Sequence, residues 1–346
     1  GARSEAAIEV LVWSDIVQES MSHSIPGTYA QLLRTAWVYI STGALFRLMR
    51  LRKGPVIAGF YPVAMLLAQL ALALAAAWLA MTAAARLWAL AGGAEGWGAL
   101  AGVLAGGLAG WAVLAWFRAR DGKLFAYYLM HDLAFSARRR GATPPALEAR
   151  IAAFADRIGG ALAEDVDEVL VVGHSSGAHL AVSALAELIR QGRVPADGPA
   201  LSFLSLGHVV PMVSFLPEAH RLRADLAFLS ARDEIAWVDV SAPGDGCSFA
   251  LCDPVAVSGV APPGKRWPLV ISAAFTRTLS PARWKALRWR FFRLHFQYLC
   301  AFDRPGDYDY FRITAGPRTL GARFAGRRPS RSRIERAASG YRGQAA

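Results

Sequence analysis

Residues 167–182 constrain the fold of this chain more than any other segment, because they join three local structures in a fixed order. An apolar, β-branched run ends at Gly173, the pattern Gly-x-Ser-x-Gly occupies residues 173–177, and an Ala- and Leu-rich stretch follows. This order predicts a strand, a sharp turn and a helix. A strained turn at a serine needs neighbours with almost no side chain, and Gly173 and Gly177 satisfy that need.

The same residues resemble the nucleophile elbow of the α/β-hydrolase superfamily. The likeness covers about residues 164–310, with a further expected strand at residues 8–13. The resemblance implies an α/β fold with a mostly parallel sheet flanked by helices, and a serine hydrolase whose Ser, acid and His follow in that chain order. Ser175 would be the nucleophile, and the backbone N–H of Ser176 would donate to the oxyanion. The motif specifies the superfamily but no substrate.

Apolar runs and helical patterns alternate after the motif. Such alternation predicts parallel βαβ units. Strands are expected at residues 201–207, 235–240 and 269–275, helices at residues 178–191 and 218–231, and a long amphipathic helix at residues 281–301.

The chain order of the family singles out one of the seven histidines as the base. A serine hydroxyl is a weak nucleophile until a base removes its proton. Only His295 follows every candidate acid in the sequence. The family usually presents this histidine from a loop, whereas His295 lies in a segment that reads as helix.

Three aspartates are candidates for the acid that orients the histidine. Asp245 lies in a Pro-Gly-Asp-Gly turn just beyond the strand at residues 235–240, where the family places its acid. Asp253 precedes Pro254 in an Asp-Pro-Val sequence that is similar to one near the acid of some lipase-like relatives. Asp239 lies within the strand and is more typical of a structural residue. Asp245 and Asp253 remain the main alternatives.

Two segments without a charged residue make the chain unusually apolar, with 54% hydrophobic residues. Residues 54–85 (32 residues) and 96–117 (22 residues) both exceed the roughly 20 residues that a helix needs to cross a bilayer. Core helices of soluble proteins rarely run so far without a charge. We therefore expect a transmembrane helical hairpin inserted into the α/β domain, which makes the lipid bilayer a partner.

Charges beside the two segments predict the orientation of the hairpin. Basic residues precede the first segment and follow the second (Arg47, Arg50, Arg52, Lys53, Arg118, Arg120 and Lys123), whereas the connection at residues 86–95 has one Arg and one Glu. The positive-inside rule then places both outer flanks, and the catalytic region, in the cytoplasm. The first residues lack the pattern of a signal peptide. The Ala-, Arg- and Gly-rich composition indicates a bacterial source, so the bilayer would be the inner membrane.

Glycines recur every fourth residue in the second apolar segment, at Gly98, Gly102, Gly106 and Gly110. A stripe of small residues permits close contact with another helix. The natural partner is the first apolar segment, and a homodimer through the same face is the alternative.

Charge and cysteine content exclude several functional classes. The net charge is +12, and residues 318–346 contain eight Arg and one Glu. This tail lacks apolar periodicity, which predicts a disordered segment. Beside a membrane hairpin, contact with anionic lipid is the preferred interpretation and a merely solvated tail is the alternative; no nucleic-acid-binding fold is recognisable. The three cysteines (Cys247, Cys252 and Cys300) predict no structural disulfide, and their spacing predicts no zinc site; no cofactor is expected.

The expected organisation has five parts. Residues 1–53 would supply the first strand and helix, 54–117 the hairpin, 118–145 a basic juxtamembrane helix, 146–316 the catalytic core and 317–346 the basic tail. The sequence thus predicts a membrane-anchored serine hydrolase acting on a lipid or other acyl ester. The alternatives are an acyltransferase with the same triad, or a catalytically inactive hydrolase fold that serves as a membrane interaction module.

Overall fold

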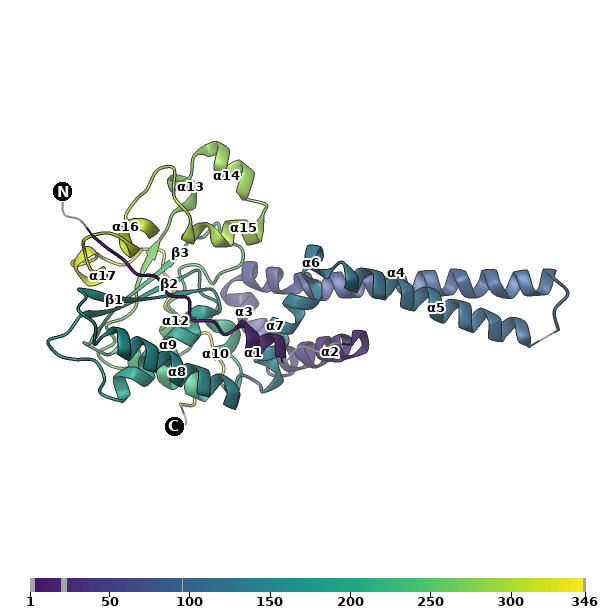
Figure 1. Ribbon diagram of the computed structural model, residues 1–346, viewed down its shortest axis with the longest axis horizontal. Coiled ribbons are helices and arrows are strands. Elements are labelled where there is room, and N and C mark those ends of the chain that lie inside the picture. The colour runs from purple at the N-terminus through teal and green to yellow at the C-terminus, as the bar shows by residue number, and fades with distance from the viewer. Residues whose placement is uncertain (1–3, 20–23, 95, 345–346) are drawn as a thin grey trace. The chain divides into compact units, whose positions relative to one another are not determined.

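The computed structural model describes residues 4–19, 24–94 and 96–344 (Figure 1). They form two compact units. The larger unit contains Gly1–Ile16, Trp37–Ala58 and Ser136–Ala346, and the smaller unit contains Val17–Ala36 and Gly59–Phe135.

The elements of the first half of the chain are helical. They are α1 (Ser14–Glu19), α2 (Ile25–Ser41), α3 (Ala44–Leu51), α4 (Lys53–Leu90), α5 (Trp97–Ala119), α6 (Asp121–Leu124), α7 (Ala126–Arg138) and α8 (Pro145–Ala161).

Strands and helices alternate in the second half. The order is β1 (Glu168–His174), α9 (Gly177–Arg190), β2 (Ala200–Leu206), α10 (Pro211–Ser214), α11 (His220–Ser230), β3 (Ile235–Ser241), α12 (Pro254–Val257), β4 (Leu269–Ser272), α13 (Phe275–Thr278), α14 (Pro281–Leu287), α15 (Phe291–His295), the 3-10 helix η1 (Phe296–Leu299), α16 (Tyr310–Thr314) and α17 (Leu320–Arg323).

The larger unit is built on a four-stranded parallel sheet in the order β1-β2-β3-β4. Its strands coincide closely with the expected ones, because buried parallel strands are continuous apolar runs in the sequence. Helix α9 connects β1 to β2 and packs against both α8 and α11, and α17 contacts β2 and β3 (Figure 1). The α/β class expected from the sequence is therefore confirmed at this level: a parallel sheet with helices packed against it.

A single apolar cluster lies between the sheet and the helices that follow β4. Alternate side chains of β2 and β3 point into it, as expected for a strand with a period of two. Its members include Leu204, Leu206, Val238, Val240, Ile271, Phe275, Leu294, Tyr298, Tyr308 and Leu320, all almost fully buried. The carboxyl ends of the strands and the segment around His295 are thus held by one core.

The expected strand at residues 8–13 is not present; these residues form no ladder within the described chain. Ile8 and Val10 expose 75% and 78% of their surface, so the alternating apolar pattern covers no core. Ion pairs at either end hold the segment instead, from Glu9 to Arg157 and from Asp15 to Arg150.

The smaller unit contains most of α4 and all of α5, two helices that are long and apolar enough to cross a membrane. Much of their apolar surface is exposed; Leu74 and Leu108, for example, expose 62% and 72% of their surface. A core helix of a soluble protein would bury such side chains. Residues of α2 and α7 join this unit because Leu32, Leu66 and Met130 form a buried cluster, so the expected piece 1–53 is divided between the two units.

The glycine stripe of α5 faces α4 of the same chain. A Cβ atom at Gly102 would lie 2.9 Å from the carbonyl oxygen of Met81, and one at Gly106 would lie 2.8 Å from that of Ala77. The absence of side chains therefore allows the two backbones to touch, as in small-residue packing of membrane helices.

The basic tail, expected to be disordered over residues 317–346, is ordered by main-chain contacts within its described part, residues 317–344. Ile334 forms a parallel bridge with Cys252, and its carbonyl accepts a hydrogen bond from the Asp253 N–H. Ser330 N–H donates to the carbonyl of Val270 in β4. Composition alone missed this because main-chain pairing, rather than apolar periodicity, holds the segment.

Candidate active site

Ser175 lies in a strained turn between β1 and α9. Its φ angle is 57°, in the left-handed region that a residue with a Cβ rarely adopts. The turn is held because Ser175 N–H donates to the carbonyl of Leu206 at 2.9 Å, beyond the end of the ladder between β1 and β2. The side chain is half-buried. This is the local geometry of a nucleophile elbow.

The two glycines of the motif are not equivalent. A Cβ atom on Gly173 would lie 2.8 Å from the Cα of Ala178, so only glycine lets the strand and the helix approach this closely. A Cβ atom on Gly177 would meet no atom within 4 Å. The expectation that both glycines relieve crowding is therefore correct for Gly173 and wrong for Gly177, which leaves open space instead.

His295 and Asp245 form a buried hydrogen-bonded pair. The Nδ1 atom of His295 lies 2.8 Å from Oδ2 of Asp245, and the two side chains are 6% and 0% exposed. Asp245 follows β3, and His295 ends the short helix α15 after β4. The structure thus brings together the expected histidine and one of its candidate acids, although 50 residues separate them.

Every oxygen of the Asp245 carboxylate has a donor. Oδ1 accepts from the N–H of Cys247 at 2.9 Å, and Oδ2 also accepts from the hydroxyl of Tyr298 at 3.0 Å. Burial opposes ionisation of this carboxyl group, but the hydrogen bond and charge of His295, together with the other donors, hold its pKa below the usual range. Asp245 is therefore ionised at neutral pH and can stabilise an imidazolium at His295.

A break in the expected helix at residues 281–301 places His295. Arg290 has non-helical angles (φ −101°, ψ 68°), so the segment forms α14, α15 and η1 rather than one helix. His295 is the last residue of a five-residue helix and not part of a continuous amphipathic face.

Two glycines that flank Asp245 pack against aromatic side chains of this segment. A Cβ atom at Gly244 would lie 2.7 Å from the ring of Trp284, and one at Gly246 would lie 3.1 Å from that of Phe291. Because these aromatic rings lie against the backbone on both sides of Asp245, the segment that carries the histidine also covers the acid.

Two residues that the sequence did not indicate fix the histidine and its acid. The Nε2 atom of His174, within the elbow itself, lies 2.9 Å from the carbonyl oxygen of His295. Burial, followed by the neighbouring charge of His295, lowers the pKa of His174 to about 4, so a neutral ring donates this bond. Tyr298 accepts from the N–H of Ala242 while donating to Asp245, which ties the acid loop to η1.

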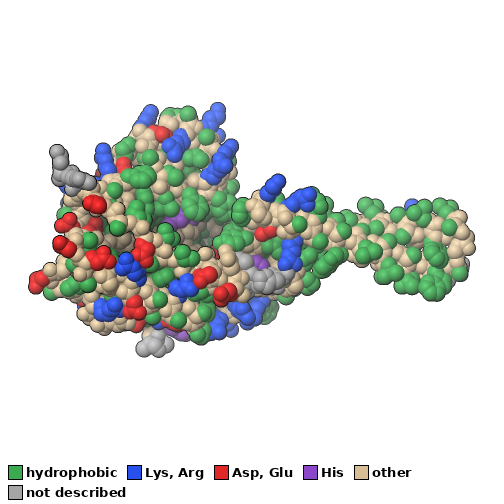
Figure 2. Space-filling model, viewed as in Figure 1, with side chains coloured by type: hydrophobic (Ala, Val, Ile, Leu, Met, Phe, Trp, Pro, Cys, Tyr) green, Lys and Arg blue, Asp and Glu red, His purple; other side chains and the backbone are tan. Residues whose placement is uncertain are grey.

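The imidazole of His295 approaches the elbow without bonding to the serine. Gly207 follows Leu206, whose carbonyl accepts from the N–H of Ser175. A Cβ atom on Gly207 would lie 3.2 Å from Cε1 of His295. The rings of His174 and His295 are 4.6 Å apart. Nε2 of His295 is buried and has no hydrogen-bond partner among the described residues, so the Ser175–His295 bond of a triad is not formed. A histidine side chain is visible in a hollow of the larger unit (Figure 2).

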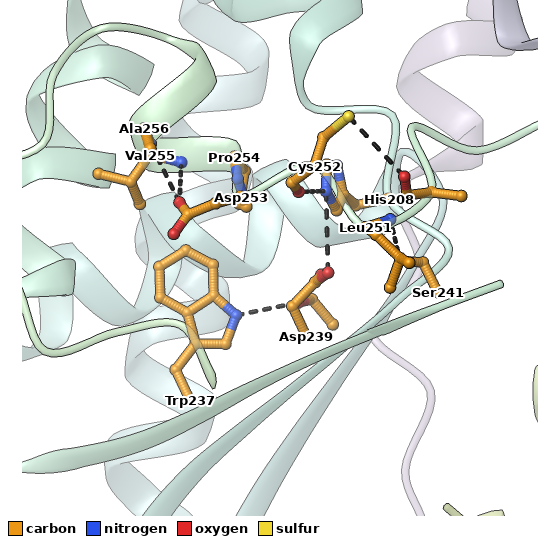
Figure 3. Close-up of polar contacts among 12 residues, drawn as sticks. His208, Trp237, Asp239, Ser241, Leu251, Cys252, Asp253, Pro254, Val255 and Ala256 are labelled. Carbon is orange, nitrogen blue, oxygen red and sulfur yellow. Dashed lines mark hydrogen bonds and ion pairs between the residues drawn. The ribbon is translucent and has the colours of Figure 1, made fainter. Parts of the chain in front are cut away.

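Asp253 serves as a helix cap and does not contact His295. Its Oδ1 accepts from the N–H groups of Val255 and Ala256, both at 3.0 Å (Figure 3). Its Oδ2 forms an ion pair with Lys265 at 2.6 Å. The Asp-Pro-Val sequence therefore marks the start of α12. Of the two main alternatives for the acid, the structure pairs Asp245 with the histidine.

Asp239 belongs to a separate buried network (Figure 3). It accepts from the hydroxyl of Ser205 at 2.6 Å, and that hydroxyl also accepts from the indole N–H of Trp237. His208 lies 3.9 Å away and contacts the carbonyl of Cys252 instead. Burial raises the pKa of Asp239 to about 6. The network resembles a triad in composition, but it is sealed from solvent, so no substrate can reach it.

Asp245, Cys247 and His295 could offer a metal three ligand atoms, which lie within 4.8 Å of one another. The chemistry of the donors does not fit a resident ion well. Burial raises the pKa of the Cys247 thiol to about 12, and a thiol must lose its proton to bind zinc. Nδ1 of His295 is already engaged by Asp245.

Comparison of the chain with protein-family models, curated proteins and solved structures gives no match.

Proposed function

We propose that this chain is a membrane-anchored serine hydrolase of the α/β-hydrolase type that cleaves an ester through Ser175, His295 and Asp245. The observation that carries the proposal is the buried pair of His295 and Asp245 beside a serine at φ 57°. The order of nucleophile, acid and histidine along β1, β3 and the segment after β4 agrees with the family that the sequence resembles.

Each residue has a defined chemical role in this proposal. Ser175 Oγ attacks the acyl carbonyl while Nε2 of His295 removes its proton, and ionised Asp245 stabilises the resulting imidazolium. The N–H of Ser176, at the start of α9, donates to the tetrahedral oxyanion. His295 then protonates the leaving alcohol, and water hydrolyses the acyl-enzyme with His295 as its base. His174 is a positioning residue that holds the backbone of His295.

The ester is expected to be membrane-borne, because anchoring raises the local concentration of such substrates. Two helices able to span a bilayer support this location. We propose that the hairpin crosses the bacterial inner membrane with its basic flanks, and therefore the larger unit, in the cytoplasm. Accessibility of single cysteines at the 91–96 connection and in the larger unit, compared in intact cells and in inverted vesicles, tests this orientation.

An active-site-directed fluorophosphonate tests the proposed chemistry. We expect the full chain, purified in detergent micelles, to be labelled, and labelling to disappear in Ser175→Ala. Ser183→Ala is the matched control, because it removes a serine hydroxyl from α9 without touching the elbow. His295→Ala should reduce the labelling rate by about a thousandfold or more, since the hydroxyl loses its base.

Absence of labelling in folded protein would favour the inactive module. The unformed bond between Ser175 and His295 is the observation that keeps this second candidate in view. In an acyltransferase the fluorophosphonate reaction would be the same, and addition of an alcohol acceptor would divert the acyl group from the free acid to a new ester.

A further inference from the structure

The segment at residues 281–300 is both basic and aromatic. It contains Arg283, Lys285, Arg288, Arg290 and Arg293, and it has no acidic residue. It also exposes large aromatic side chains; Trp289, Phe291, Phe292 and Phe296 expose 72%, 47%, 44% and 54% of their surface. We call these residues, which lie on α14, α15 and η1 and in the turn between α14 and α15, the basic aromatic surface. Figure 2 shows Lys and Arg side chains projecting from the larger unit in this region.

Most of the positive charge on this surface is not neutralised. Arg283 pairs with Asp303 at 3.4 Å, whereas no ion pair involves Lys285, Arg288, Arg290 or Arg293 within the described residues. Arg288 lies over the ring of Trp289, 5.6 Å from its centre, which leaves the guanidinium beside an exposed indole. A surface that keeps four free cations among exposed aromatic rings is complementary to a partner that is both anionic and apolar.

An open groove of about 650 Å³ runs across the surface. Arg290 and Arg293 line it together with Phe292, Phe296 and Cys300. The groove is mostly apolar, and its cationic groups stand beside it. Acyl chains with anionic headgroups present the matching combination.

We propose that the basic aromatic surface docks on the surface of an anionic lipid bilayer. Tryptophan and phenylalanine would lie at the level of the headgroups, and the arginines would contact lipid phosphates. The two candidate membrane spans of the same chain keep the larger unit tethered close to such a bilayer. A protein partner would need an acidic and apolar surface, and nothing in the sequence or structure points to one.

The position of this surface gives the contact a consequence. The same segment ends helix α15 with His295, and Phe296 packs on the ring of His174 with 5.0 Å between ring centres. Lipid contact would therefore occur directly beside the candidate site. The docking does not depend on the proposed catalysis, and its test uses no measurement of activity.

Electron paramagnetic resonance of the full chain tests the proposal, and no cysteine substitution is needed to attach the label. Cys300 is exposed, whereas Cys247 and Cys252 are buried, so a nitroxide reagent attaches selectively to Cys300. The labelled protein is reconstituted in nanodiscs of phosphatidylcholine alone, or of phosphatidylcholine with phosphatidylglycerol. Collision of the nitroxide with oxygen, which partitions into lipid, is compared with its collision with a water-soluble nickel chelate.

We expect the logarithm of the oxygen-to-nickel accessibility ratio to change from negative to positive when phosphatidylglycerol is added. In R288E/R290E/R293E it should stay negative in both lipids. The matched control R328E/R331E/R336E makes the same change of charge in exposed arginines of the tail and should behave as the wild type. A ratio that stays negative for the wild type in both lipids overturns the proposal and directs the search to a protein partner. An equal loss in both triple variants also overturns it, because net charge alone would then explain binding.

Discussion

Replacing His174 by glutamine tests whether a neutral imidazole at this position donates the hydrogen bond that holds the backbone of His295. Burial, followed by the charge of His295, lowers the pKa of His174 to about 4, and its Nε2 donates to the His295 carbonyl at 2.9 Å. The amide of glutamine also donates a hydrogen bond, but it does not titrate. We therefore expect His174→Gln to keep most of the stability of the wild type at pH 7 and to lose part of its sensitivity to acid.

The sign and size of the effect follow from the lowered pKa. As the pH falls, His174 gains its proton near pH 6.5 in the unfolded chain but only near pH 4 in the folded chain. The contribution of His174 to stability is therefore complete above pH 6.5 and is lost as the pH falls to about 4. A pKa lowered from 6.5 to about 4 corresponds to about 3 kcal/mol in the free energy of unfolding. Partial exposure of the ring to solvent reduces the expected loss to about 2 kcal/mol.

Urea unfolding of the full chain in detergent micelles, followed by tryptophan fluorescence, measures this difference at pH 7 and near pH 4. His179, whose pKa burial also lowers to about 4, and Asp239 titrate in both proteins, so they cancel when the two are compared. The variant should lose about 2 kcal/mol less than the wild type on acidification. Equal losses in the two proteins would refute the assignment of a neutral, buried donor at His174.

Three further predictions concern stability. Gly173→Ala should lower the free energy of unfolding by about 1–3 kcal/mol, because the added Cβ would lie 2.8 Å from the Cα of Ala178. Gly177→Ala should change the free energy of unfolding by less than about 1 kcal/mol, and urea unfolding measures both variants. Gly106→Leu should separate α4 from α5 and lower the melting temperature in detergent, while Gly107→Leu, where no atom lies within 4 Å, should not. Burial raises the pKa of Asp239 to about 6, so this residue should contribute a loss of about 3 kcal/mol as the pH rises from 3.8 to about 6; between these two pH values, urea unfolding should show the stability of Asp239→Asn changing by about 3 kcal/mol in its favour relative to the wild type.

Local sequence patterns predicted those parts of the fold in which successive residues are similarly buried. Strands β2 and β3 are buried along almost their whole length and β1 is half-buried, so their sequences are mostly apolar and their limits were expected within about one residue. The fourth strand is shorter than expected, because Ala274 turns the chain with a φ angle of 46° and Phe275 begins α13. The elbow was predicted because its strain requires Gly173, a constraint visible in the sequence itself.

Patterns failed where tertiary contacts override local preference. Residues 8–13 have the alternation of a strand but no neighbouring strand with which to pair, and residues 317–346 have the composition of a disordered tail but pair with the chain near Cys252. The segment at residues 281–301 has helical periodicity, yet it breaks at Arg290. The contacts of Trp284 and Phe291 with Gly244 and Gly246 accompany this break, and they depend on a loop some 40 residues earlier. No sequence window contains both partners.

The choice of acid shows most clearly what separates sequence from structure at this site. Asp245 and Asp253 lie in one loop after the same strand, and each precedes a residue that favours a turn or a helix start. The free N–H groups at the start of α12 engage Asp253, and Lys265 neutralises its charge. Asp245 instead receives Tyr298 and His295 from beyond β4. Because a carboxylate buried without donors would be very costly, the available donors decide which aspartate can stay ionised beside an imidazole. These donors come from segments whose positions only the folded chain defines, so the sequence could not show which aspartate contacts His295.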